Sequence, residues 1–201
     1  MMHGFTESLT NWFTNQGVGD LIDTSVQAGG SINRATIIRF GSGERYFLKQ
    51  NQHAPESMFA SEAQSLQLIT ARAAFPVPKP FYWDAQCLLM EVIDPAPKQK
   101  DYWEIFGRQL AAMHRVTQAN FGLDFQTYCG TTLQNNQPQQ DGYAFFADQR
   151  LLPLGQQANA KGLLQAADMA AIESLCRRLT GLIPFQPASL IHGDLWSGNA
   201  H

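Results

Sequence analysis

The sequence predicts an α+β protein with two lobes, the first an antiparallel β-sheet with one long helix and the second mainly helical. Strand-like patterns dominate the first half of the chain, where a single helical pattern over residues 55–74 interrupts them. After residue 98 the apolar residues recur at helical spacing. A loop of the form H-x-D-x-x-x-x-N, from His192 to Asn199, follows near the C-terminus. This order of elements is typical of a bilobal protein-kinase-like fold whose second lobe is incomplete.

The first lobe is expected over residues 1–94. It begins with a short amphipathic helix over residues 3–16, in which Phe5, Leu9 and Phe13 lie at helical spacing. Short β-rich runs separated by glycine turns then predict an antiparallel sheet. Five strands are expected, at 22–26, 35–40, 46–49, 81–83 and 87–93. The long helix lies between the third and fourth strands and ends before Pro78, since proline disfavours helical backbone at the preceding residue.

The second lobe is expected over residues 95–201, after a proline-rich linker at 94–97. Apolar periodicity predicts helices at 101–116, 141–152 and 163–181. The segment 122–140, rich in Asn and Gln, is expected to be an irregular loop. A short strand at 189–191 is expected to lead into the His192 loop.

Composition excludes several classes of function. The 201 residues carry a net charge of −3 and show no basic stripe, so we expect no nucleic-acid partner. No apolar run approaches the roughly 18 residues that a membrane helix needs, so we expect no membrane partner. Three widely spaced cysteines form neither a C-x-x-C pair nor a zinc spacing, and a cytoplasmic location is the simplest interpretation. The sequence leaves the oligomeric state open.

The loop that contains Asp194 and Asn199 points most directly to a chemistry. An Asp and an Asn five positions apart match the phosphotransferase catalytic loop, where the Asp accepts the substrate hydroxyl proton and the Asn binds Mg²⁺. An amide oxygen suits this hard cation. An ordinary turn is the alternative, because Gly, Asp, Ser and Asn are common turn residues. The apolar strand before the loop favours Asp194 as proton acceptor and Asn199 as metal ligand, with His192 bracing the loop.

Lys49 and Glu62 form a second candidate site. Lys49 ends an otherwise apolar strand, and Glu62 lies near the apolar face of the following helix. In a kinase lobe such a pair joins strand to helix, and the lysine reaches the α- and β-phosphates of the nucleotide. A solvated strand lysine and a surface glutamate are the alternative. The order of the elements favours the pair.

Two further segments could contact a nucleotide. Gly29, Gly30 and Ser31 lie in a turn whose backbone could approach phosphates closely, although a plain hairpin turn explains them equally well. Glu91, Val92 and Ile93 end an apolar strand that runs into the linker. In a kinase-like lobe such a segment offers main-chain N–H and C=O groups to adenine, and it is a buried strand at the same time.

Several of these residues together resemble the fructosamine kinase family, also called ketosamine-3-kinases. The segment from Leu190 to Asn199 is similar to the family's signature, and its Leu-Trp-Ser-Gly separates it from aminoglycoside and choline kinases. Other similar stretches are at 29–33, 46–49, 58–69, 121–123, 131–135 and 145–151. The resemblance extends in order over nearly all of residues 4–200.

The resemblance implies an ATP-dependent kinase that uses Mg²⁺ and acts on ketoamines, of fructosamine or ribulosamine type. The acceptor would be a small-molecule or a protein-linked ketoamine. Phosphorylation at the third carbon of the sugar destabilises the adduct, so the implied role is deglycation repair. The resemblance assigns Asp194 as proton acceptor, Asn199 as magnesium ligand, Lys49 with Glu62 to the phosphates, and residues 91–93 to adenine.

Two departures from the family pattern are visible. Eukaryotic members often have a cysteine in the glycine-rich turn, where this chain has Ser31. Members also continue past the His-Gly-Asp loop and supply a second metal-binding Asp and further helices. We therefore expect this chain to be a fragment that is inactive alone. Two alternatives stay open, a kinase for another small alcohol such as an aminoglycoside or choline, and a nucleotide-binding pseudokinase or scaffold.

Overall fold

The computed structural model describes residues 4–27, 32–73 and 75–199. They fall into two compact units. The first comprises Met1–Gln109 together with His192–His201, and the second comprises Leu110–Ile191. The lobe boundary expected at residue 94 stays a prediction. In the described part of the chain, no helix has both the length and the hydropathy needed to cross a bilayer.

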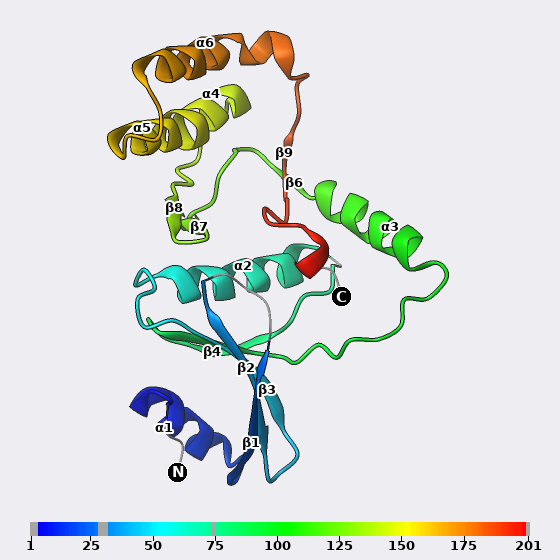
Figure 1. Cartoon of the computed structure of the whole chain (residues 1–201). Coiled ribbons are helices and arrows are strands. Elements are labelled where there is room, and N and C mark those ends of the chain that lie inside the picture. The colour runs from blue at the N-terminus through cyan, green and yellow to red at the C-terminus, as the bar shows by residue number, and fades with distance from the viewer. Residues whose placement is uncertain (1–3, 28–31, 74, 200–201) are drawn as a thin grey trace. The chain divides into compact units, whose positions relative to one another are not determined.

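The first unit is built on the predicted five-stranded antiparallel sheet (Figure 1). Its spatial order is β1-β2-β3-β5-β4, so β3 lies at the centre. The strands are β1 (Leu21–Gln27), β2 (Arg34–Phe40), β3 (Arg45–Gln50), β4 (Pro80–Trp83) and β5 (Cys87–Met90).

The strand β5 is shorter than predicted. It ends at Met90, and Glu91, Val92 and Ile93 follow without regular secondary structure. The partner of Met90 in β4 is Pro80, which has no N–H to donate to the ladder. The strand expected to reach residue 93 was therefore three residues too long, which leaves Val92 and Ile93 outside the ladder.

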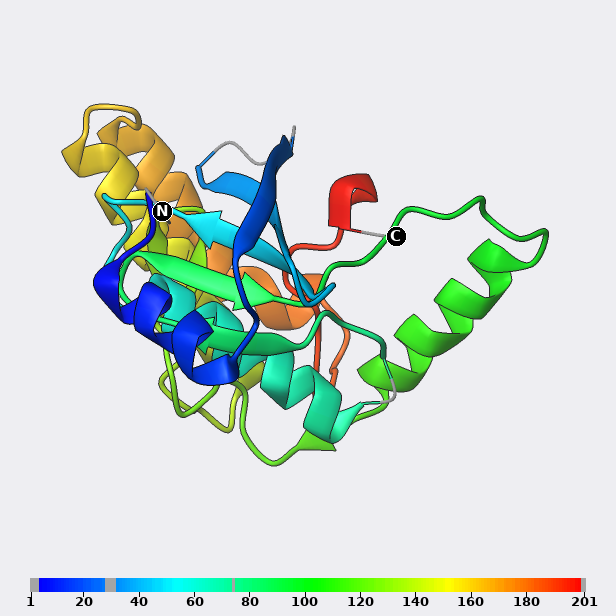
Figure 2. The same ribbon diagram turned by 90° about the horizontal axis from the view of Figure 1, so that it is seen from below.

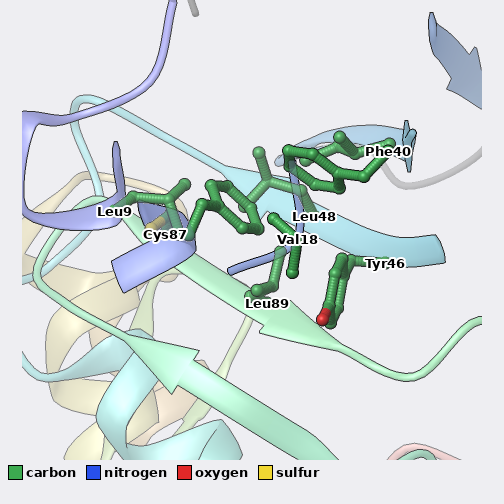
Figure 3. Packing of buried hydrophobic residues seen from close by; sticks show 9 residues of the cluster. Leu9, Val18, Phe40, Tyr46, Leu48, Cys87 and Leu89 are labelled. Atoms are coloured by element: carbon green, nitrogen blue, oxygen red, sulfur yellow. The ribbon is translucent and has the colours of Figure 1, made fainter. Parts of the chain in front are cut away.

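One face of the sheet packs against α1 (Glu7–Gln16) and forms the main hydrophobic core (Figure 3). Leu9 and Phe13 of this helix are fully buried, and the Phe13 ring lies 4.6 Å from that of Phe40. The helix begins where the Thr6 hydroxyl accepts the Leu9 N–H, and it ends at Gly17, whose φ of 66° suits glycine. The sheet contributes Ile38, Phe40, Tyr46, Leu48, Cys87 and Leu89 to this core.

The opposite face of the sheet packs against α2 (Met58–Arg72), as Figures 1 and 2 show. Phe59 and Ala63 of α2 are fully buried. Successive side chains in a strand point to opposite faces, so Leu48 faces the α1 core and Lys49 faces α2. The pleat of β3 therefore directs Lys49 towards the helix that contains Glu62.

The second unit contains most of the remaining helices and two small sheets. Its elements are β6 (Thr117–Gln118), β7 (Thr127–Cys129), β8 (Thr132–Gln134), α4 (Gly142–Phe146), a π-helix (Ala147–Leu151), α5 (Leu152–Ala160), α6 (Ala166–Leu182) and β9 (Ala188–Ser189). The helix α3 (Tyr102–His114) crosses the division between the units. The strand β9 pairs with β6, and β7 pairs with β8.

Two predictions for this region were wrong. The segment 122–140 contains the β7–β8 hairpin, where a loop without regular structure was expected. The helix expected to end at residue 152 continues through the π-helix and α5 to Ala160. Pro153 lies in the first turn of α5, where proline is tolerated, and Gly155 is buried where a Cβ would lie 3.0 Å from the Ile172 side chain of α6.

Asp84, in the turn between β4 and β5, joins the sheet to the start of α1. Its Oδ2 accepts hydrogen bonds from the Thr6 and Tyr82 hydroxyls at 3.1 and 3.0 Å. Its Oδ1 accepts from the backbone N–H groups of Gln86 and Cys87 at 2.8 and 2.9 Å. Partial burial raises the pKa of Asp84, but these hydrogen bonds outweigh burial, and the net pKa is lowered.

Replacing Asp84 by Asn should reduce the dependence of stability on pH in the acidic range. Because the folded-state pKa is lowered, the carboxylate contributes stability that is present above the unfolded pKa of about 3.9 and is lost as the pH falls through the folded pKa. The wild-type and Asp84→Asn free energies of unfolding, measured by urea titration, should differ most near neutral pH and converge below about pH 4. Asp23→Asn, on exposed β1, is the matched control. A constant difference at every pH would contradict this role.

Candidate functional site

Lys49 and Glu62 form an ion pair that joins the sheet to α2. The Lys49 Nζ lies 2.5 Å from the Glu62 Oε1, and the two side chains are 30% and 32% exposed. Lys49 is held in the middle of the sheet, between Ala35 of β2 and Leu88 of β5. Ser61 and Ala63, which flank Glu62, are buried, so the glutamate lies beside the apolar face of its helix. The predicted contact is present, and its role towards phosphates stays a prediction.

The loop from His192 to Asn199 is held by hydrogen bonds between its own residues. The Asn199 side-chain amide donates to the Asp194 carbonyl at 2.8 Å and to the Asp194 Oδ2 at 3.0 Å. The Asp194 N–H donates to the His192 Nδ1 at 3.4 Å, which is the expected bracing contact of His192. Gly193 between them has a φ of 85°, a conformation that glycine adopts without steric cost. A short 3₁₀ turn, Ser197–Asn199, brings Asn199 back towards Asp194.

This geometry leaves two oxygen atoms available for chemistry. The Asp194 Oδ1 and the Asn199 Oδ1 accept no hydrogen bond from the described residues. The first suits a proton acceptor, and the second is the kind of neutral oxygen that binds a hard cation. Among the described residues, no three His, Cys, Asp or Glu side chains gather into a cluster that could hold a metal ion. Asn199 would therefore supply one ligand of a magnesium ion and not a complete site.

The candidate nucleotide-contacting segments lie at two places. Gly29, Gly30 and Ser31 are outside the described residues, between the paired strands β1 and β2. Glu91 to Ile93 follow β5 without regular secondary structure, and the Ile93 side chain is 45% exposed. Their contacts with a nucleotide stay predictions. The Lys49–Glu62 and Asp194–Asn199 pairs belong to the same compact unit.

Sequence reasoning missed a bidentate ion pair beside the linker. The Arg45 guanidinium donates to both carboxylate oxygens of Asp94, with Nη1 to Oδ2 at 2.8 Å and Nη2 to Oδ1 at 2.7 Å. The two residues are 49 positions apart in the chain, and neither belongs to a motif. The only local signal is that Asp94 precedes Pro95, which favours extended backbone at Asp94.

Comparison with known proteins decides the family. The sequence profile of the fructosamine kinase family matches residues 7–201. The chain belongs to the fructosamine kinase family. A relative from Klebsiella aerogenes, named "Probable ketoamine kinase", is 38% identical over 176 residues, which cover 85% of this chain and 60% of the relative. The chain thus spans about three fifths of the length of that relative.

Solved structures agree with this family and its fold. A protein from Thermobifida fusca assigned as a fructosamine-3-kinase superposes with a TM-score of 0.83 and 29% identity, over 97% of this chain and 69% of that one. A macrolide 2′-phosphotransferase type I superposes with a TM-score of 0.53 and 16% identity, over 98% of this chain and 68% of its own. The second likeness shows the fold alone. The expected protein-kinase-like fold is confirmed.

Proposed function

We propose that the protein carrying this chain transfers the γ-phosphoryl group of ATP to a hydroxyl group on the sugar part of a ketoamine. The observation that carries the proposal is the Asp194–Asn199 loop, in which Asn199 donates to Asp194 and leaves one oxygen of each side chain unengaged by the described residues. Membership of the fructosamine kinase family supports the acceptor class. The Leu-Trp-Ser-Gly of the Asp194 loop, which resembles the fructosamine kinase signature, favours a ketoamine over an aminoglycoside or choline as the acceptor.

Asp194 is the proposed proton acceptor. The sugar hydroxyl oxygen attacks the γ-phosphorus, a new P–O bond forms, and the bond between that phosphorus and the bridging oxygen of ADP breaks. The hydroxyl proton passes to the Asp194 carboxylate. Asn199 and His192 fix the loop around Asp194, so its carboxylate meets the hydroxyl in a set orientation.

The nucleotide is proposed to lie between the candidate segments of the first unit. Lys49 would contact the α- and β-phosphates, and Glu62 would keep its flexible side chain in place. Gly29, Gly30 and Ser31 would cover the phosphates, and the main chain of residues 91–93 would meet adenine. Mg²⁺, bound through the Asn199 amide oxygen among other ligands, would neutralise phosphate charge.

The proposed acceptor is a fructosamine or ribulosamine, either a free metabolite or an adduct on a protein lysine. Phosphorylation of the hydroxyl group on the third carbon of the sugar would make the adduct unstable and lead to release of the amine. The proposed biological role is therefore deglycation repair.

Replacing Asp194 by Asn in the full-length gene product should lower kcat with a fructosyl- or ribulosyl-amine by about 10²- to 10⁴-fold, because positioned proton transfer is lost. The affinity for ATP should stay within about threefold, since Asp194 is proposed to face the hydroxyl. ADP release in a coupled assay gives kcat, and calorimetric titration gives the affinity. Asp148→Asn, at an exposed position, is the matched control.

Three outcomes would contradict parts of this proposal. Turnover by Asp194→Asn within a few-fold of wild type would remove Asp194 as the proton acceptor. Faster phosphorylation of an aminoglycoside or choline than of any ketoamine would replace the acceptor class. Wild-type protein that binds ATP but phosphorylates none of these substrates would be a pseudokinase.

Replacing Glu62 by Gln should lower kcat/KM for ATP by about 10- to 100-fold, the effect of losing a charge-assisted hydrogen bond of roughly 1.5–3 kcal/mol. Lys49→Ala should lower kcat/KM for ATP by at least as much as Glu62→Gln does. The double variant should be no worse than Lys49→Ala, because the proposed task of Glu62 is to position Lys49. Steady-state kinetics with varied ATP measures these ratios. Glu56→Gln, at an exposed position just before α2, is the matched control. Multiplicative losses would contradict the coupling.

A further inference from the structure

The segment from Glu91 to Asp94 is fastened to the sheet at both of its ends. At the first end the Glu91 N–H donates to the Lys79 carbonyl at 2.9 Å, and the Lys79 N–H donates to the Glu91 Oε2 at 3.2 Å. At the second end the Arg45 guanidinium donates one hydrogen bond to each carboxylate oxygen of Asp94. Val92 and Ile93 lie between these two anchors.

Val92 and Ile93 are the residues whose main chain is left unengaged. Within the described part of the chain, their N–H and C=O groups make no hydrogen bond. The segment has no regular secondary structure, and the Ile93 side chain is 45% exposed. These two consecutive residues, held on both sides, offer main-chain donors and acceptors with which an aromatic base could form hydrogen bonds.

The bidentate Arg45–Asp94 ion pair, called the fork below, is well suited to fix the Asp94 end of the segment. Arg45 is the first residue of β3 and pairs with Arg39 of β2, so its backbone belongs to the sheet. Two parallel N–H···O bonds define the orientation of the Asp94 carboxylate as well as its distance. Pro95 further restricts Asp94 to extended backbone. The linker therefore leaves the sheet in one direction.

The electrostatics of the fork favour its charged form. The hydrogen bonds from Arg45 lower the pKa of Asp94, partial desolvation opposes this, and the charges of Arg45 and Arg39 lower the pKa further. Asp94 also offsets the repulsion between these two arginines, which face each other across the strands. Its side chain is 64% exposed, so the fork adds little to the stability of the whole protein.

We propose that Arg45 and Asp94 are positioning residues for recognition of the nucleotide base, acting by fixing the main chain of Val92 and Ile93. The inference rests on the proposed ATP-dependent activity and adds a pair of residues that sets its affinity and selectivity for adenine. Neither side chain touches the nucleotide in this proposal. Their effect is to hold the main chain of Val92 and Ile93 in place before the base binds.

A double-mutant cycle on the full-length gene product tests the fork. Arg45→Ala and Asp94→Ala should each weaken ATP binding about 5- to 10-fold, on the order of the cost of ordering one backbone residue. The double variant should be no weaker than either single variant, because both remove the same restraint. The KM for ATP should rise while kcat and the KM for the ketoamine stay within about threefold. The ratio of ATP to GTP affinity should fall.

Three further variants separate the effect of the two parallel hydrogen bonds from the effects of charge and of overall stability. Arg45→Lys keeps the positive charge but not the two parallel bonds, so it should lose affinity as Arg45→Ala does. Arg108→Ala and Glu104→Ala remove a second exposed ion pair, on α3, and should leave nucleotide affinity unchanged. Thermal unfolding midpoints of all variants should stay close to wild type.

The outcomes distinguish this inference from the proposed function. Wild-type protein that neither binds ATP nor phosphorylates a ketoamine would overturn the proposed function. Wild-type protein that does both, with Arg45→Ala and Asp94→Ala unchanged in ATP affinity, would overturn the positioning role alone. Losses that multiply in the double variant, or an Arg45→Lys protein with normal base selectivity, would also overturn it.

Discussion

The candidate site depends first on the pleat of β3, the central strand of the sheet. Leu48 points into the core beneath α1, and Lys49, the next residue, points towards α2. A shift of one residue in register would exchange these two directions and place an ammonium group in an apolar core, at a prohibitive cost. The pairings with β2 and β5 on the two sides exclude that shift. Hydrophobic burial of Leu48 therefore determines where Lys49 points.

Hydrophobic burial also sets the point at which β5 leaves the sheet. Fully buried Leu88 and Leu89 hold β5 against β3 up to Met90, whose partner in β4 is Pro80. The chain then leaves the sheet with free main-chain groups at a place set by the core. The Arg45–Asp94 fork adds direction to that exit. The core that holds β5 thus also sets where the proposed adenine-contacting segment begins.

Sequence patterns predicted what is decided over short distances in the chain. Asp194 and Asn199 lie within one loop, and Lys49 precedes Glu62 by 13 residues on consecutive elements, so their spacing carries most of the geometry. The Arg45–Asp94 fork depends on the sheet bringing residues 49 positions apart together, and a single sequence holds no signal for that. The same holds for Gly155, in a helix that continues beyond its predicted end to Ala160. Its role is the close approach of α5 to α6, which only tertiary packing reveals.

The Asp194 loop depends on local contacts, whereas Lys49 and residues 91–94 depend on long-range pairing in the sheet, so the parts of the candidate site could assemble in different ways. Among the described residues, the hydrogen bonds around Asp194 come from His192, Asn199 and the loop itself, so this part of the candidate site is held by local contacts. Lys49 and the segment at 91–94 require a finished sheet. Substitutions in the α1 core should therefore disturb the nucleotide half through the sheet, while the geometry around Asp194 is set by its own neighbours. The proposed acceptor side and the proposed nucleotide side are thus stabilised by different interactions, the first within one loop and the second through the folded sheet.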